Sequence, residues 1–185
     1  MVNNFFDHEA LLGMRTRVFY TLLAKLETTQ SPSMQNLLAT NMLSVASVDK
    51  LDLLISWLSA GAICSESAST LQKILPLSKA LRYQILKVLF RSPRFTQEDK
   101  ERHLRLEMAE DFSNYDLNLK AACEAANCDM LAKEKVWGQY VKGEGFKNIL
   151  EYKWSVANFY NIEDEAQCRH FGEAFFRDLE AVFST

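Results

Sequence analysis

Histidines are the residues of this chain best suited to bind a metal ion or transfer a proton near neutral pH. His8 precedes Glu9, but the second histidine of the metalloprotease motif His-Glu-x-x-His does not follow. His103 and Glu107 are spaced i and i+4, so on a helix they could share one face and even one metal ion. His103 lies within the charged run at 100–105, and Glu107 follows it; such a run is typical of a solvated helix face with ion pairs. We therefore expect no metal site there.

His170 lies next to Arg169 near the start of the last predicted helix, and we expect a surface or boundary histidine rather than a catalytic base. The chain contains no Gly-x-Ser-x-Gly nucleophile motif and no P-loop motif. Its six glycines are never adjacent, which argues against a loop that cradles phosphate. The sequence thus predicts no catalytic, cofactor-binding or metal-binding residue in this chain. It leaves any peptide-binding residues undetermined.

The cysteines show no ligand spacing. They are Cys64, Cys123, Cys128 and Cys168. None of them forms Cys-x-x-Cys, and their separations do not match a zinc site. Cys123 and Cys168 fall within apolar helical patterns, so we interpret them as small core residues in a reducing compartment.

The acidic clusters and the aromatic residues could each either form a binding site or have a structural role. Glu110-Asp111 and Glu163-Asp164-Glu165 are acidic clusters; the second suits a helix N-terminus, where carboxylates offset the helix dipole, and no calcium-loop glycine follows. Aromatic residues at helical spacing could line a ligand groove, but such residues usually form the core. They are Trp137, Tyr140, Trp154, Phe159 and Tyr160.

The composition favours a helical, globular protein. Of 185 residues, 48% are hydrophobic and 24% charged, with only 6 Gly and 3 Pro, fewer than an all-β protein with many turns would carry. A net charge of −3 argues against a nucleic-acid partner. No stretch approaches the about 20 apolar residues of a membrane span, and the N-terminus does not resemble a signal peptide. We therefore expect no membrane partner and a cytoplasmic location.

Apolar spacing predicts a helix almost everywhere. The expected helices cover residues around 11–26, 34–45, 51–58, 81–89, 96–112, 113–125, 129–141, 146–157 and 163–183. Residues 61–77 are the exception, and we expect an irregular connector with one short helix around Leu71–Leu75. The whole chain, 1–185, is predicted to form a single α-helical domain.

Several residues mark where these helices begin and end. Pro32 suits a first helical turn, and Gly61 can end a helix in the left-handed conformation. Ser78 can cap a helix start, as can the pairs Thr96 with Asp99 and Ser113 with Asp116. Short polar turns make consecutive helices pack antiparallel. With no strict repeat period, the predicted fold is all-α: an irregular HEAT/armadillo-like α-solenoid of about nine helices in antiparallel pairs.

The segment from Leu77 to Phe183 also resembles a known family. The resemblance lies in residues 76–86 (PLSKALRYQIL), 107–116 (EMAEDFSNYD), 121–129 (AACEAANCD), 133–137 (KEKVW) and the apolar residues of the last helix, Phe171 to Phe183. Together these segments resemble the C-terminal helical domain of zinc aminopeptidases of the aminopeptidase N and puromycin-sensitive type. Residues 11–60 fit that domain more loosely. The family often ends on Trp, where this chain has Phe183.

The resemblance implies a function within a larger enzyme. Members of the family are multidomain zinc exopeptidases that remove N-terminal residues from peptides. Their zinc motif and Gly-Ala-Met-Glu-Asn-type loop belong to an earlier domain, and neither is present here. Their helical domain forms a bowl that closes over the active site. This chain would then be a non-catalytic domain that gates access and contacts peptide substrate, partnered in cis or trans by a catalytic domain that holds the zinc.

The resemblance also implies that this chain is a truncated form of the domain. A truncated solenoid exposes an apolar end, so the first helix either seals that end or pairs with another copy in a homodimer. The alternative function is a free-standing HEAT-like module that binds a partner helix or peptide in a concave groove. An independent enzyme is a third hypothesis, which no visible nucleophile–base pair or metal set supports.

Overall fold

The computed structural model describes residues 8–65, 73–108, 113–161 and 163–183, with side chains placed as far as Leu179. The chain divides into two compact units, Met1–Val88 and Leu89–Thr185, called unit 1 and unit 2 below. Nine α-helices, one 3-10 helix and one pair of short strands make up the described part, so the prediction of a mostly helical protein is confirmed. The single domain over 1–185 stays a prediction.

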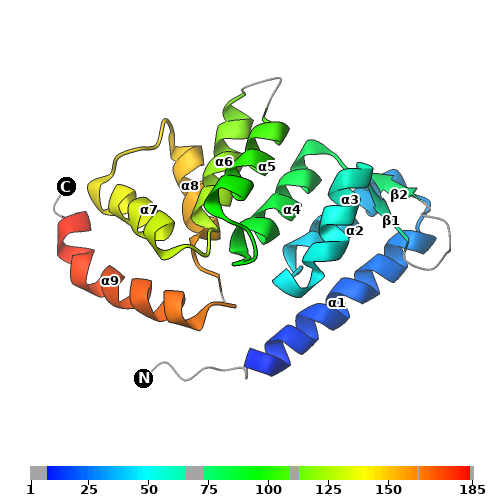
Figure 1. Cartoon of the computed structure of the whole chain (residues 1–185), viewed down its shortest axis with the longest axis horizontal. Helices are drawn as coiled ribbons and strands as arrows, with labels where there is room; N and C mark the ends of the chain where they lie inside the picture. Colours follow the sequence, from blue (N-terminus) through cyan, green and yellow to red (C-terminus); the bar gives the residue numbers. More distant parts are fainter. Residues whose placement is uncertain (1–7, 66–72, 109–112, 162, 184–185) are drawn as a thin grey trace. The chain divides into compact units, whose positions relative to one another are not determined.

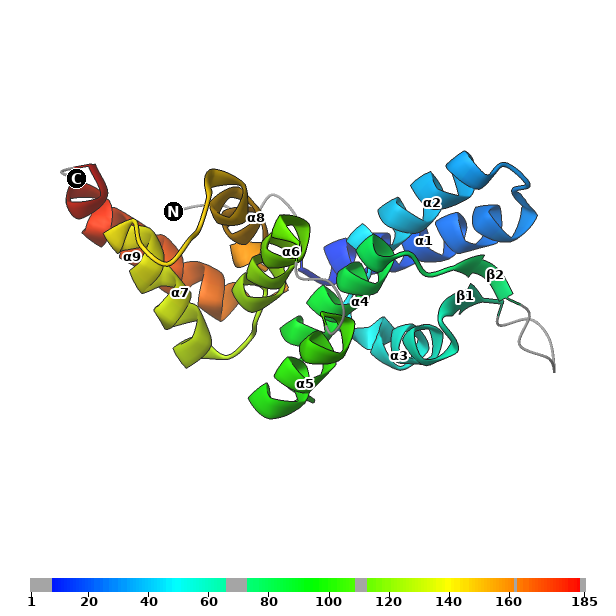
Figure 2. The same cartoon turned by 90° about the horizontal axis from the view of Figure 1, so that it is seen from above.

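Unit 1 is built from helices and one hairpin. In chain order they are α1 (His8–Thr28), α2 (Pro32–Ser44), the 3-10 helix η1 (Val48–Lys50), α3 (Leu51–Ala60), β1 (Ala62–Cys64) and β2 (Lys73–Pro76), followed by α4 (Lys79–Arg91), which continues into unit 2. Helices α1 and α2 lie side by side in both views (Figures 1 and 2). Trp57 is fully buried and stacks on Phe19, with ring centroids 6.2 Å apart. The α1–α2 pair and α3 thus share one core.

The apolar surface of α1 is only partly buried. Phe19, Leu23 and Leu26 face the core, whereas Met14 and Val18 of the neighbouring stripe are 53% and 40% exposed. A core of this size covers about one face of a helix, so the second stripe remains at the surface. The predicted homodimer through this surface stays a prediction.

The connector at 61–77 contains a β-hairpin rather than a short helix. Strand β2 pairs antiparallel with β1, with Ala62 opposite Pro76 and Ile63 opposite Leu75. Pro76 disfavours helical backbone in the residue before it, and Ile63 and Leu75 gain a buried position in the extended form. The helix predicted around Leu71–Leu75 is therefore wrong for its described part, while Leu71 lies outside the described residues.

Unit 2 is built from helices alone over its described residues. It contains α5 (Gln97–Glu107), α6 (Asn114–Ala125), α7 (Met130–Lys142), α8 (Ile149–Phe159) and α9 (Glu165–Phe183). Helix α8 packs along α6, and α7 contacts both α6 and α9. Their shared core consists of Ala125, Val136, Phe159, Phe171 and Ala174, with Trp137 and Tyr140 packed against it. Helices α6 and α7 therefore each contact the helix two places further along the chain.

Most predicted helix ends are confirmed. Ser113 and Asp116 form a full capping box at the start of α6, and the Ser78 hydroxyl accepts a bond from the Leu81 N–H at 3.4 Å. Gly61 ends α3 with φ 67°, the left-handed conformation that glycine adopts without strain. Helix α5 ends at Glu107 rather than reaching Phe112, which lies outside the described residues. Among the helices of the described part, none is long and apolar enough to cross a membrane.

Candidate functional site

His103 and Glu107, the pair whose spacing suits a shared metal ion, both lie on α5. His103 is half-buried and its ring meets Phe95 edge-on, with centroids 6.2 Å apart. Around it, α5 carries the ion pairs Arg102–Asp99 (3.0 Å) and Arg105–Glu101 (3.6 Å), as expected of a charged surface. Over residues 8–65, 73–108, 113–161 and 163–183, no group of three or more His, Cys, Asp or Glu side chains could hold a metal ion.

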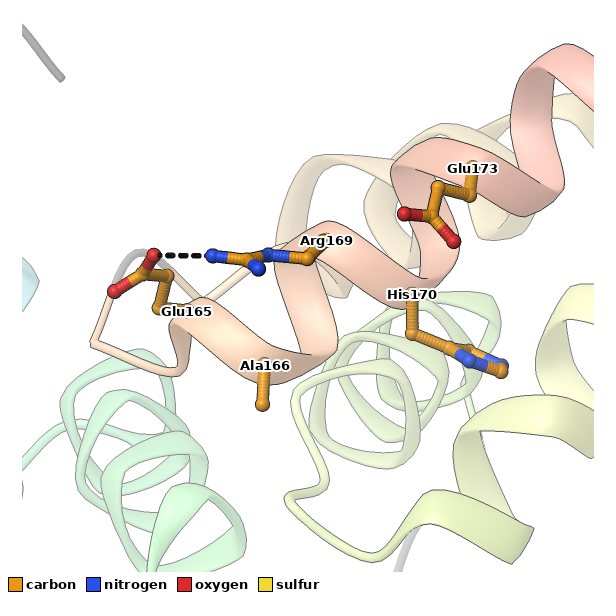
Figure 3. A pocket seen from close by; sticks show the side chains of 5 residues that line it. All are labelled: Glu165, Ala166, Arg169, His170 and Glu173. Carbon is orange, nitrogen blue, oxygen red and sulfur yellow. Dashed lines mark hydrogen bonds and ion pairs between the residues drawn. The ribbon is translucent and has the colours of Figure 1, made fainter. Parts of the chain in front are cut away.

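His170 lies on the exposed surface of α9, as predicted. A shallow pocket on this helix is lined by Glu165, Ala166, Arg169, His170 and Glu173. Figure 3 shows Arg169 reaching back to Glu165, with a 3.0 Å ion pair, while His170 points to the other side. There its Nε2 atom lies 3.7 Å from the Glu134 carboxylate of α7. All five lining residues are exposed, so water reaches the ionisable groups of this pocket.

Three of the five candidate groove aromatics form core instead. Trp137, Tyr140 and Phe159 pack together, and burial raises the pKa of the Tyr140 hydroxyl, although its 2.7 Å hydrogen bond with Ser155 opposes that rise. The other two lie further out. Trp154 meets Tyr115 edge-on, and Tyr160 is 49% exposed.

The acidic cluster at the start of α9 caps the helix, because the Asp164 carboxylate accepts a bond from the Gln167 N–H at 2.9 Å. Glu110-Asp111 lies outside the described residues. All four cysteines are free; Cys64 and Cys123 are buried, while Cys128 and Cys168 are only half-buried. The interpretation of Cys168 as a core residue is therefore correct only in part. Its Sγ atom donates to the Asn161 carbonyl at 3.2 Å.

The most unusual chemistry of unit 2 is a group of polar side chains around two buried lysines. This buried lysine cluster consists of Lys100, Asn127, Cys128, Lys133, Asn161, Gln167 and Cys168. Lys100 and Lys133 are 2% and 1% exposed, although lysine is rarely buried without a partner. Their partners therefore decide what the cluster does.

Lys133 hydrogen-bonds to backbone carbonyls at the C-terminal ends of two helices. Its Nζ atom donates to the Ala125 carbonyl in the last turn of α6 at 3.0 Å and to the Phe159 carbonyl at the end of α8. It also lies 4.3 Å from the centre of the Phe159 ring. The last carbonyls of a helix lack intrahelical donors and carry partial negative charge, so an ammonium group is a suitable partner for them.

Burial makes the charge of Lys133 costly. The net effect of burial, which is the largest cause, and of the nearby Arg91 charge lowers the pKa of Lys133 from 10.5 to about 8, although Cys168 and Asp164 oppose the change. Burial in turn raises the pKa of the Cys168 thiol, against the effect of Lys133. The cluster thus contains an amine that titrates close to neutral pH.

Lys100 joins α5 to the turn between α6 and α7. Its Nζ atom lies 2.9 Å from Asn127 Oδ1 and 3.2 Å from Cys128 Sγ. The Asn127 amide in turn donates to Gln97 at 2.7 Å, while its oxygen accepts from the Asp129 N–H at 3.1 Å. The lysine and the sulfur are held in fixed contact by these neighbours.

Sequence reasoning missed this cluster. Lys100 begins the run 100–105, which the sequence predicts to be a solvated face, yet its side chain is buried while Glu101 and Arg102 are exposed. The available signal was its spacing of four residues from the buried Leu104. A charged side chain on the apolar stripe of a helix indicates a buried polar contact.

In comparisons with known proteins, no protein family, curated protein or solved structure matches the chain.

Proposed function

We propose that this chain is a non-catalytic helical part of a zinc aminopeptidase, which gates access to the active site of a catalytic domain and contacts peptide substrate. The catalytic domain, in cis or in trans, would supply the zinc, and the enzyme would act in the cytoplasm. The support is the resemblance of residues 77–183 to that family's C-terminal domain. Nothing in the proposal assigns a catalytic role to a residue of this chain.

The observation that carries the proposal is the order of helix contacts in unit 2. Helix α6 packs on α8 and α7 packs on α9, so alternate helices are neighbours, and α6 also contacts α7. Stacked helix pairs have this pattern, because each pair buries its apolar face against the next pair. The capped starts of α6 and α7, at Ser113 and Asp129, fall within the segments that resemble the family. An irregular HEAT-like solenoid is the arrangement that we propose on this basis.

The decisive experiment isolates the native polypeptide that carries this sequence. We expect material captured from cells with an antibody against residues 113–161 to contain zinc and to release the fluorophore from aminoacyl-coumarin substrates. A zinc chelator should stop that release. The isolated 185-residue chain should hydrolyse nothing, with or without zinc. Native material without zinc or peptidase activity, or hydrolysis by the isolated chain, would overturn the proposal.

A second candidate function, a free-standing module that binds a peptide or a helix, is favoured by the outer face of α8. Large apolar side chains on that helix remain at the surface: Ile149 is 63%, Leu150 54% and Val156 41% exposed. Exposed apolar groups that recur along one helix are typical of a surface that binds another protein.

The two candidate functions predict different effects of substitutions on α8 on the partners captured with the chain. The double variant Ile149→Lys and Val156→Lys should keep the fold, since both side chains are exposed, and Lys153→Ala on the same helix is the control. If the chain is a free-standing module, the double variant should lose a partner that has no peptidase activity, while the control keeps it. Retention of every partner by the double variant would argue against this second function.

A further inference from the structure

Within the buried lysine cluster, Lys100 and Cys128 bring an amine and a thiol into direct contact. The distance of 3.2 Å between Nζ and Sγ joins residues that are 28 apart in the chain. Cys128 is half-buried, whereas Lys100 is almost fully enclosed. A small oxidant can therefore reach the sulfur, while the amine meets no competing reactant except that sulfur.

The backbone holds the sulfur in place from two sides. The Cys128 N–H donates to the Phe90 carbonyl at 3.1 Å, and the Cys128 carbonyl accepts from the side-chain amide of Gln167 at the start of α9. Asn127 fixes the amine by accepting from Lys100 Nζ at 2.9 Å. Two reactive groups held at contact distance react far faster than the same groups free in solution, because the entropy of bringing them together is already lost.

We propose that Lys100 and Cys128 form an oxidant-dependent covalent cross-link, a sulfenamide between Nζ and Sγ, with hydrogen peroxide as the oxidant. The site is independent of the peptidase proposal, because it needs only residues of unit 2. Neither Cys64 nor Cys123 competes for the oxidant, since both are buried.

The reaction balances in two steps. First, the Cys128 sulfur attacks one oxygen of hydrogen peroxide; the O–O bond breaks, the sulfur becomes a sulfenic acid, and water leaves. Second, Lys100 Nζ, after losing a proton to solvent, attacks that sulfur; the S–O bond breaks, the hydroxide takes a proton from the nitrogen, and a second water leaves. One thiol, one amine and one peroxide thus yield one S–N bond and two waters. A thiol reductant cleaves the S–N bond and restores both side chains.

The cross-link would tie α5 to the turn before α7. It closes the chain between residues 100 and 128 and so restricts the unfolded state, as a disulfide does. Oxidation should therefore raise the melting temperature of the chain, and reduction should return it to its starting value.

The test is mass spectrometry of the full chain after mild treatment with hydrogen peroxide. We expect a peptide that joins Lys100 to Cys128, lighter than its two parts by two hydrogen atoms, with trypsin unable to cut after Lys100. Dithiothreitol should abolish that peptide. The Lys100→Arg variant, which keeps the positive charge, should give no cross-link, and its Cys128 should advance to the sulfinic acid. Cys168→Ser, the control for the other half-buried cysteine, should cross-link as the wild type does.

Three results would overturn the proposal. They are a Cys128–Cys168 disulfide, a sulfinic acid at Cys128 of the wild type with Lys100 still cut by trypsin, and a joined peptide that retains an added oxygen atom. Should Lys100→Arg fail to fold, Cys128→Ser provides a second comparison. It keeps the shape of the side chain, and the joined peptide must disappear in it while circular dichroism stays unchanged.

Discussion

Unit 1 and unit 2 bury different kinds of side chain. Among the described residues, unit 1 has one buried polar residue, Ser47, beside an apolar and aromatic core around Trp57 and Phe19. The buried polar residues of unit 2 are Ser92, Lys100, Asp116, Asn118, Asn127, Lys133, Ser155, Asn161 and Gln167. Unit 1 is thus held mainly by apolar burial, whereas unit 2 also depends on hydrogen bonds that are costly to break inside a protein.

The helix starts show the same contrast. In unit 2, the side chains of Thr96, Ser113, Asp129 and Asn148 each accept a backbone N–H at the start of a helix. In unit 1, α2 and α3 follow Ser31 and Lys50, neither of which makes such a bond, and α4 is the exception because Ser78 accepts the Leu81 N–H. The comparison indicates that polar side chains fix where the helices of unit 2 begin, while packing against the core fixes them at α2 and α3.

The largest effect should follow from a cavity in unit 1. Trp57→Ala removes a fully buried indole, and we expect a loss of about 3–5 kcal/mol in the free energy of unfolding. Hydrogen exchange of peptides from 8–65 should report it. Trp57→Phe, the control, keeps a ring against Phe19 and should cost less. An equal loss of protection over 113–161 would contradict a loss confined to unit 1, because the two units would then unfold together.

A smaller effect should follow from the loss of Lys133. Lys133→Met leaves the Ala125 and Phe159 carbonyls without their donor but also removes a buried charge, so we expect a net loss of about 2 kcal/mol at pH 7. Urea denaturation measures it. Lys135→Met on the same helix is the control, since Lys135 is exposed and its replacement should change little. No difference between the two variants would mean that the cluster does not stabilise unit 2.

The lowered pKa of Lys133 should also make the stability of unit 2 depend on pH. The folded unit releases the Lys133 proton at the lowered pKa of about 8, and the unfolded chain keeps it up to about 10.5. The unfolded state thus binds more protons between these values, so wild-type stability should rise with pH across this window. Below pH 8 this group contributes no slope. Lys133→Met should lack the rise; an equal slope in both proteins would contradict the lowered pKa.

The smallest of these effects concerns helix capping. Ser113→Ala removes the acceptor for the Asp116 N–H and should cost about 1 kcal/mol. Ser31→Ala at the start of α2 removes no such bond and should change stability by only a few tenths of that amount. Thermal melts of both variants test the difference. Equal costs at the two positions would remove the distinction between the capped start of α6 and the uncapped start of α2.

Local sequence was sufficient to predict most of the helices. The start of α2 at Pro32, the end of α3 at Gly61 and the capping box at Ser113 depend on residues within one turn of the chain. The same reasoning failed at β2, where the helical spacing of Leu71–Leu75 competed with an extended pairing. A strand partner some ten residues away decides that competition, and a local pattern does not contain it.

By itself, the sequence determined that this chain is mostly helical and where most helices begin and end, because periodicity and capping act over a few residues. Only the tertiary structure decided which of two apolar stripes of α1 is buried and that Lys100 and Lys133 point inward. Lys100 depends on Asn127 and Cys128, and Lys133 on the carbonyl of Phe159, each at least 26 residues away. Such contacts exist only after the helices pack, so the local sequence can place Lys100 on an apolar helix stripe but cannot identify its partners.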